Sequence, residues 1–165
     1  MPVNLGDLPL NMPLLNGKVQ MKRGGADVVY NVAAGNNGQK ILDNAGGNME
    51  IFYTPRYPCW WIVHGNIMAH GYPDGVGWRR WDLSIRITPA DVNGVVVGHQ
   101  CPHQLYDNGT VEWRTIGSSC AFRLAAGIAY NAYLCTEYTS AGTVQLHTGP
   151  QWCRILGRIV GETVV

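Results

Sequence analysis

Residues 118–160, SSCAFRLAAGIAYNAYLCTEYTSAGTVQLHTGPQWCRILGRIV, decide the fold class of this chain. Apolar, β-branched and aromatic runs alternate here with turn residues, a pattern typical of short strands. It predicts a buried strand, an Ala-Ala-Gly turn at residues 125–127, an aromatic-rich strand, a glycine-bearing loop and a closing strand. Because side chains alternate along a strand, Phe122 and Leu124 should point inward with Arg123 between them on the opposite face.

A helix over residues 125–135 is the alternative interpretation, because alanine and leucine are frequent in that run. Gly127 and Asn131 argue against it, as do the nearby tyrosines, since these residues have low helix propensity. We therefore expect a turn followed by a strand.

The rest of the chain shows the same alternation of apolar runs and turn residues. Residues 81–88 are the clearest case: Trp81, Leu83, Ile85 and Ile87 alternate with polar residues, which predicts a strand with one buried face. Many short strands separated by turn signals are typical of an all-β, antiparallel sandwich or barrel. Further strands are expected at residues 27–33, 40–43, 49–54, 60–70, 95–101 and 110–116, with a tight turn at residues 107–109.

Composition bounds the function. The chain has 165 residues, a length that suits one globular domain. Charged residues make up only 14%, whereas 21 glycines, 9 prolines, 6 tryptophans and 8 tyrosines favour turns and strands over long helices. A net charge of +1 gives no basis for nucleic-acid binding, which needs clustered lysines and arginines. The low charged fraction suggests instead a surface that partner proteins cover.

The sequence shows no signal for secretion or membrane insertion. Its first residues, MPVNLGDLPLN, lack a basic start and an apolar run, and no apolar segment is long enough to span a bilayer. Five cysteines form an odd set at irregular spacing, so we expect buried thiols rather than a disulfide framework. These features indicate synthesis in the cytoplasm.

The N-terminal residues 1–26 are expected to form an extended arm. Pro2, Pro9 and Pro13 disfavour a helix there and suit a polyproline-like run. A loose terminus is the alternative. The predicted division is an arm with a first short strand over residues 1–38 and a sandwich domain over residues 39–165. The apolar residues of the arm, which are candidates for docking on a larger assembly, are Leu8, Leu10, Met12, Leu14 and Leu15.

Several motifs together resemble the C1q/TNF-like jelly-roll family. KILD at residues 40–43 is similar to an early strand of that family, and FYTPRYPCWWIV at residues 52–63 to its aromatic strand behind a proline corner. SSCAFRLAAGIAYNAYL at residues 118–134 is similar to its serine-led strand, and CRILG at residues 153–157 to its last strand. The resemblance implies an antiparallel jelly-roll β-sandwich. The chain departs from the family pattern at Ile128, where an acidic residue is usual, and in lacking the final phenylalanine.

A second resemblance concerns function. FYTPRYPCWW at residues 52–61, TPAD at residues 88–91 and FRLAAG at residues 122–127 look like segments of small structural proteins of tailed bacteriophages. This implies a homotrimeric virion protein, a capsid decoration (cement) or head-fibre component that docks through its arm on the major capsid protein or another virion protein and stabilises the particle. The alternative is a receptor-binding knob that recognises a host surface polysaccharide.

The sequence offers little for catalysis, and we expect a protein without enzymatic activity or cofactor. The segment GSSC at residues 117–120 lacks the second glycine of a nucleophile elbow. His99, Cys101 and His103 share one face of an expected strand and could in principle bind zinc, but no fourth ligand is marked by spacing. A metal-dependent or hydrolytic enzyme on a cupin-like sandwich is therefore the least favoured hypothesis.

The tryptophans exceed what a core of this size needs. Trp60 and Trp61 should lie on opposite faces of one strand, so that one can face the core and the other a subunit. Tryptophan and tyrosine are common at protein interfaces, and exposed ones can also stack on sugars. The residues expected at the subunit interface are Trp61, Tyr130, Tyr133, Trp152 and Leu156.

Overall fold

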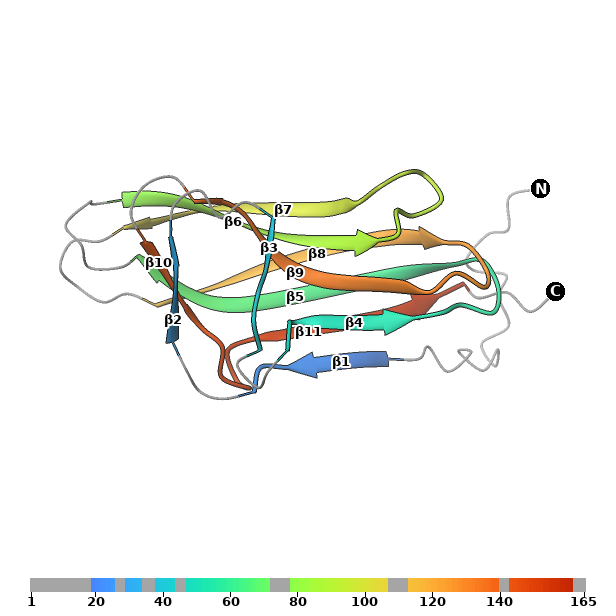
Figure 1. Cartoon of the computed structure of the whole chain (residues 1–165), viewed down its shortest axis with the longest axis horizontal. Coiled ribbons are helices and arrows are strands. Elements are labelled where there is room, and N and C mark those ends of the chain that lie inside the picture. The colour runs from blue at the N-terminus through green and yellow to red at the C-terminus, as the bar shows by residue number, and fades with distance from the viewer. Residues whose placement is uncertain are drawn as a thin grey trace, which may run out of the picture.

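The computed structural model describes two antiparallel β-sheets that face each other in an elongated sandwich (Figure 1). The first sheet contains β1 (Val19–Arg23), β11 (Arg154–Val160), β5 (Cys59–Gly71), β10 (Thr143–His147), β2 (Val29–Ala33) and β8 (Arg114–Leu124). The second sheet contains β3 (Gln39–Lys40), β4 (Glu50–Tyr53), β9 (Tyr130–Thr139), β6 (Trp78–Thr88) and β7 (Val97–Tyr106). The residues described are 19–25, 29–33, 38–43, 47–71, 78–106, 113–139 and 143–161.

The long strand β5 organises the first sheet. One of its edges pairs with β8 from Cys59 to Ala69. Its other edge is shared, because β11 pairs with the first half of β5 and β10 with the second half. Strands β1 and β2 then extend the sheet beyond β11 and β10. The first sheet therefore has a continuous centre and a divided outer flank.

The core lies between the two sheets and follows the period of two. In β5 buried and exposed residues alternate, and Trp61, Val63 and Ile67 are fully buried. The inward residues of β6 and β8 meet them. They include Trp81, Leu83, Ile85, Ile87, Ile116, Phe122 and Leu124.

The stretch around the Ala-Ala-Gly turn confirms the strand interpretation. Phe122 and Leu124 are fully buried, and Arg123 between them is exposed. The helix considered for residues 125–135 is wrong: Gly127 adopts a positive φ of 76°, which favours glycine, and β9 starts at Tyr130.

Three other expectations change in detail. The strand predicted to end at residue 116 continues through Gly117, because β8 runs as one strand from Arg114 to Leu124. The last part of the expected arm is strand β1, which pairs with β11, while residues 1–18 lie outside the described part of the chain. The turn expected at residues 107–109 also lies outside it. The described part contains no helix of the length and hydropathy that a membrane crossing needs.

Candidate functional site: the outer face of the first sheet

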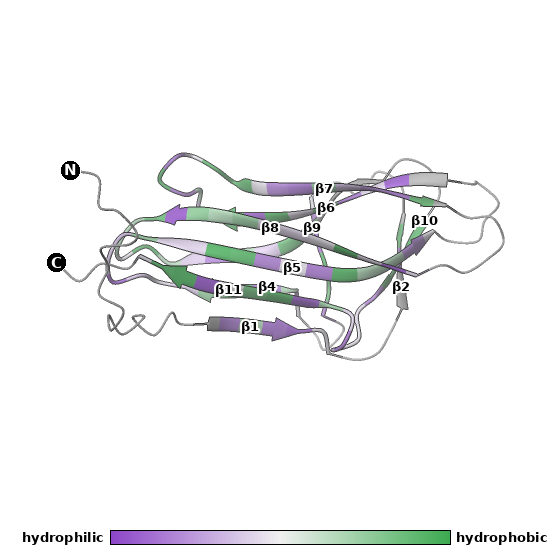
Figure 2. Cartoon of the chain, turned by 180° about the vertical axis from the view of Figure 1, so that it is seen from behind, coloured by the Kyte–Doolittle hydropathy of each residue, from purple (hydrophilic) through white to green (hydrophobic). Residues whose placement is uncertain are grey.

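The outer face of the first sheet is the side that points away from the second sheet. Its strands alternate hydrophobic and hydrophilic residues (Figure 2), because every second side chain is committed to the core. The cross-strand register fixes which residues share this face. They are Met21 and Arg23 of β1, the even-numbered residues 60–70 of β5, the odd-numbered residues 115–123 of β8, Gln145 and His147 of β10, and the even-numbered residues 154–160 of β11.

One end of this face carries an apolar zone, which we define as Met21, Trp60, Ile62, Leu156 and Val160. Trp60 is 45% exposed, Met21 48% and Val160 41%, although all three belong to regular strands. Trp60 and Val160 are direct partners across β5 and β11, and Met21 and Leu156 are partners across β1 and β11. Contiguous exposed apolar side chains of this kind mark interaction surfaces.

The charge on the outer face has one sign. Its charged residues are Arg23, Arg123, Arg154 and Arg158, and none of the described residues on it is an aspartate or a glutamate. The chain has 12 lysines and arginines against 11 acidic residues, so outside these four arginines the acidic residues outnumber the basic ones. The described part of the outer face is therefore basic.

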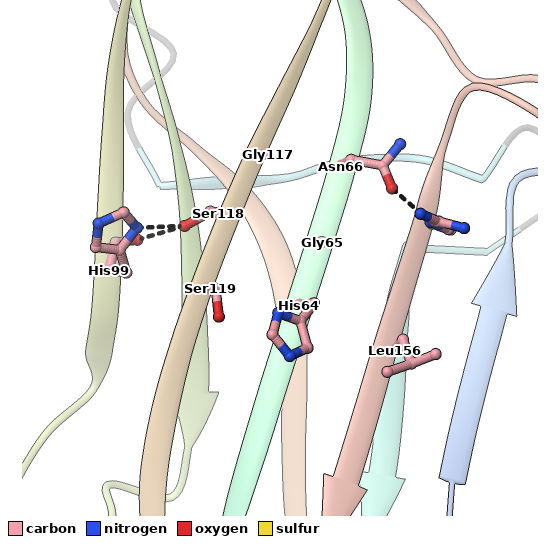
Figure 3. Close-up of a pocket in the computed structure, with 9 residues that line it drawn as sticks. His64, Gly65, Asn66, His99, Gly117, Ser118, Ser119 and Leu156 are labelled. Atoms are coloured by element: carbon pink, nitrogen blue, oxygen red, sulfur yellow. Dashed lines mark hydrogen bonds between the residues drawn. The ribbon is translucent and has the colours of Figure 1, made fainter.

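A shallow trough of about 760 Å³ crosses the middle of the face (Figure 3). Its lining residues His64 and Asn66 come from β5, Ser119 from β8 and Arg154 from β11. Asn66 ties the strands together: its Oδ1 accepts a hydrogen bond from Arg154 Nε at 2.7 Å, and its Nδ2 donates to the carbonyl of Trp152 at 3.2 Å. Gly117 leaves the floor open, because nothing lies closer than 3.6 Å to the position of a Cβ there.

Beyond the trough a row of four aromatic rings follows. The ring centroids of His70 and Trp113 are 5.0 Å apart, those of Trp113 and His147 5.5 Å, and those of His147 and Trp152 5.8 Å. His70 is buried at the base of the row, whereas the other three rings are partly exposed. The row joins β5, the start of β8, β10 and the turn before β11.

The HxCxH segment lies at the edge of the sandwich. His99, Cys101 and His103 pair with the inward-facing residues of β6, so they share one face of β7, as expected. Ser118 Oγ lies 2.8 Å from His99 Nδ1, across the seam between β7 and β8. Burial, together with the charge of Arg114, lowers the pKa of His103. Within the described residues no group of three histidine, cysteine or acidic side chains is placed to hold a metal ion.

The residues predicted for the subunit interface are scattered. Trp61 is fully buried in the core, so Trp60 takes the exposed position of that pair. Tyr130 is also buried, and its hydroxyl accepts a hydrogen bond from the backbone N–H of Ala125 at 3.0 Å. Tyr133 belongs to β9 in the second sheet, where the Lys40 ammonium lies 4.4 Å from its ring centroid.

Only Leu156 and Trp152 of the predicted set lie at the outer face of the first sheet. Sequence reasoning missed Trp60, Met21 and Val160. The period of two would have found Trp60 once Trp61 was assigned to the core. The docking candidates Leu8, Leu10, Met12, Leu14 and Leu15 lie outside the described residues.

The comparisons with known proteins bear on the fold. No protein-family model matches the sequence, and no curated protein matches it. Among solved structures, Eiger TNF from S. frugiperda is similar over 89% of this chain and 94% of its own, with a TM-score of 0.53 and 16% sequence identity. The chain therefore has a TNF-like jelly-roll β-sandwich fold, as the sequence motifs implied.

Two more distant structures also align. A CocE/NonD family hydrolase from Staphylococcus aureus is similar over 91% of this chain but only 38% of its own, with a TM-score of 0.47 and 9% identity. The C-terminal domain of the sugar-binding protein EclA aligns with a TM-score of 0.39 and 12% identity, over 74% of this chain and 76% of its own.

Proposed function

We propose that the protein is a non-enzymatic structural protein that works as a homotrimer, a capsid decoration or head-fibre component of a tailed bacteriophage. The observation that carries the proposal is the apolar zone on a regular strand surface, with the exposed indole of Trp60 at its end. A large indole is rarely left on a flat sheet face unless a partner covers it, and tryptophan is prominent among the residues that dominate binding energy at interfaces.

The charge distribution favours a head-to-tail contact. Packing two copies of this face against each other would bring Arg23, Arg154 and Arg158 of one copy close to the same arginines of the other. Contact with a different surface of the neighbour, away from these arginines, avoids this repulsion. Contacts between unlike surfaces close into rings when the rotation allows. A ring of three is what the resemblance to the C1q/TNF-like family implies.

The role in a virion is supported by the segments at residues 52–61, 88–91 and 122–127, which resemble bacteriophage structural proteins. On this proposal the trimer binds the major capsid protein or another virion protein through the N-terminal arm. It reinforces the particle by burying surface between the two proteins. Its proposed location is the virion.

Two measurements test these steps. Analytical ultracentrifugation of the full chain should give a mass three times the 18.1 kDa of one chain. A monomer at tens of micromolar would overturn the trimer. Proteomic analysis of gradient-purified particles from the encoding virus should find the chain in stoichiometric amount, and its absence from the particles would overturn the virion role.

A second candidate function is host recognition through a surface polysaccharide. The observation that favours it is the row of partly exposed rings Trp113, His147 and Trp152. Aromatic rings present a flat apolar surface with a polar edge, which suits the apolar faces of sugar rings. Quenching or enhancement of tryptophan fluorescence by host polysaccharide, lost in Trp152→Ala, would support this function. An unchanged spectrum would count against it.

A further inference from the structure

We propose that the trough on the outer face of the first sheet binds an acidic saccharide. In this assignment the lining residues Arg154, Asn66 and Ser119 hold the anionic group, aided by Arg23, the cross-strand partner of Arg154 beside the trough. The row of aromatic rings holds the sugar. The inference rests on the host-recognition function and deepens it by naming the chemistry of the ligand.

An arginine pair without a described counter-charge lies beside the trough. Arg23 of β1 and Arg154 of β11 are direct cross-strand partners, and both side chains belong to the outer face. Like charges directly opposite each other destabilise a sheet. No acidic residue among the described ones lines the trough or belongs to this face. An anion between the two guanidinium groups would remove the repulsion.

Hydrogen bonds already hold Arg154 in one orientation. Its Nε donates to Asn66 Oδ1 at 2.7 Å, and Asn66 is itself fixed by its bond to the Trp152 carbonyl. The two terminal amino groups of Arg154 remain for a ligand, in the fork that matches a carboxylate or sulfate. Because the side chain is already held, less conformational entropy is lost when the anion binds.

Two hydrogen-bonding side chains share the trough with Arg154. His64 and Ser119 are direct cross-strand partners on β5 and β8, and their side chains lie next to each other in Figure 3. The hydroxyl and the imidazole can hydrogen-bond sugar hydroxyls as well as an anion. Gly117, in the next outward position of β8, leaves room for a ring above the sheet.

The extent of the trough distinguishes a saccharide from a bare ion. Its lining runs from Arg154 of β11 across β5 to Ser119 of β8, which is wider than a single inorganic anion. The aromatic row begins where the trough ends, because Asn66 bonds the backbone of Trp152, the last ring of the row. A sugar can thus stack on an indole while its acidic group reaches Arg154.

Calorimetric titration of the full chain tests the assignment. The probes are trigalacturonate, a hyaluronate tetrasaccharide, sialyllactose and a heparin tetrasaccharide, each beside its uncharged methyl-ester or desulfated counterpart. Inorganic phosphate and sulfate form a separate arm. We expect at least one acidic saccharide to bind ten-fold or more tightly than its uncharged counterpart and than either inorganic ion.

Variants locate the site. Arg154→Gln and Arg23→Gln should each weaken binding of that saccharide by ten-fold or more. Arg123→Gln is the matched control, because it removes an arginine from the same face beside Trp60, away from the trough. It should leave the affinity within two-fold. Thermal unfolding of each variant checks that the fold is kept.

Three outcomes would overturn the assignment. Equal affinity for charged and uncharged probes, with binding lost in Trp152→Ala, would support polysaccharide recognition. It would also show that an acidic group on the saccharide does not contribute to binding. Equal affinity for phosphate, sulfate and the saccharides would reduce the trough to an ion site. Absence of binding to every probe, with Arg154→Gln turning trimers into monomers, would make the trough a subunit contact.

Discussion

Gly157 of β11 lies directly against the indole of Trp61 on the neighbouring strand β5. A Cβ at position 157 would overlap Trp61 Nε1 and lie 2.6 Å from Ile51 Cδ1 of the second sheet. Among the described residues Trp61 Nε1 is buried without a hydrogen-bond partner. The absent side chain at position 157 therefore lets the largest core residue of β5 fit between the sheets.

Gly157→Ala should accordingly destabilise the fold. The methyl group has no space beside a rigid indole, and overpacking of this kind costs about 1–3 kcal/mol. Urea unfolding followed by tryptophan fluorescence would measure the loss. Gly117→Ala is the control: it also places a methyl group on a strand glycine, but at ordinary van der Waals distance, with no atom closer than 3.6 Å. Its free energy of unfolding should therefore stay within about 0.5 kcal/mol of the parent value. Equal effects of the two changes would contradict the packing account.

Replacing Trp60 or Trp61 should separate assembly from folding. Trp61→Ala removes a fully buried side chain and should cost about 3–5 kcal/mol of folding stability. Trp60→Ser removes an exposed one and should leave the unfolding free energy of the monomer nearly unchanged. If Trp60 is central to the proposed trimer, the change should weaken association by about 2 kcal/mol or more, measured by sedimentation equilibrium. Unaltered association in Trp60→Ser would exclude the apolar zone as the contact.

The thiols of Cys120 and Cys153 should react slowly. Burial raises the pKa of both to about 12, with the charge of Asp43 adding to the effect at Cys153. The thiolate is the reactive form, so at pH 8 both should resist alkylation by iodoacetamide in the folded protein and react on unfolding. Peptide mass spectrometry after timed alkylation would check this. Rapid labelling of either residue in the native state would contradict the burial.

Glu50 should contribute a small, pH-dependent stability. Burial alone would raise its pKa, but hydrogen bonds from Lys40 and Asn131, with the charge of Lys40, lower it below its ordinary value. A lowered folded pKa stabilises the protein above the unfolded pKa, and this contribution is lost as the pH falls through the folded pKa. Because the pair is partly solvated, Glu50→Gln should cost at most about 0.5 kcal/mol at pH 7. The unfolding free energies of the parent and of Glu50→Gln should converge as the pH falls through the folded pKa of Glu50, and a gap that widened in acid would contradict this ion pair.

The sequence predicts the strands and the buried residues well where the alternation within one strand is sufficient. The alternation in residues 81–88 is sufficient to assign Trp81, Leu83 and Ile85 to the core, since burial on one face imposes a period of two. It fails where the outcome depends on partners far along the chain. The burial of Tyr130 depends on the turn at Ala125, whose backbone N–H donates a hydrogen bond to the Tyr130 hydroxyl. The sequence alone does not predict that hydrogen bond.

The candidate site was less accessible from sequence for the same reason. Arg23 and Arg154 meet only because β1 pairs with β11 in one register, and no local pattern links two arginines so far apart. The trough needs residues of β5, β8 and β11 side by side. The period of two puts Trp60 and Trp61 on opposite faces of β5, but it does not say which of these faces meets the second sheet.

Four arginines, with no described acidic residue among them, make the outer face of the first sheet a local source of positive potential. Two copies that diffuse toward each other, or one copy approaching an anionic cell surface, would be turned by this field before they touch. Productive collisions then become more frequent than random orientation allows, most of all at low ionic strength, where the field reaches farther. A partner of opposite charge would thus meet the outer face of the first sheet more often than a neutral partner would.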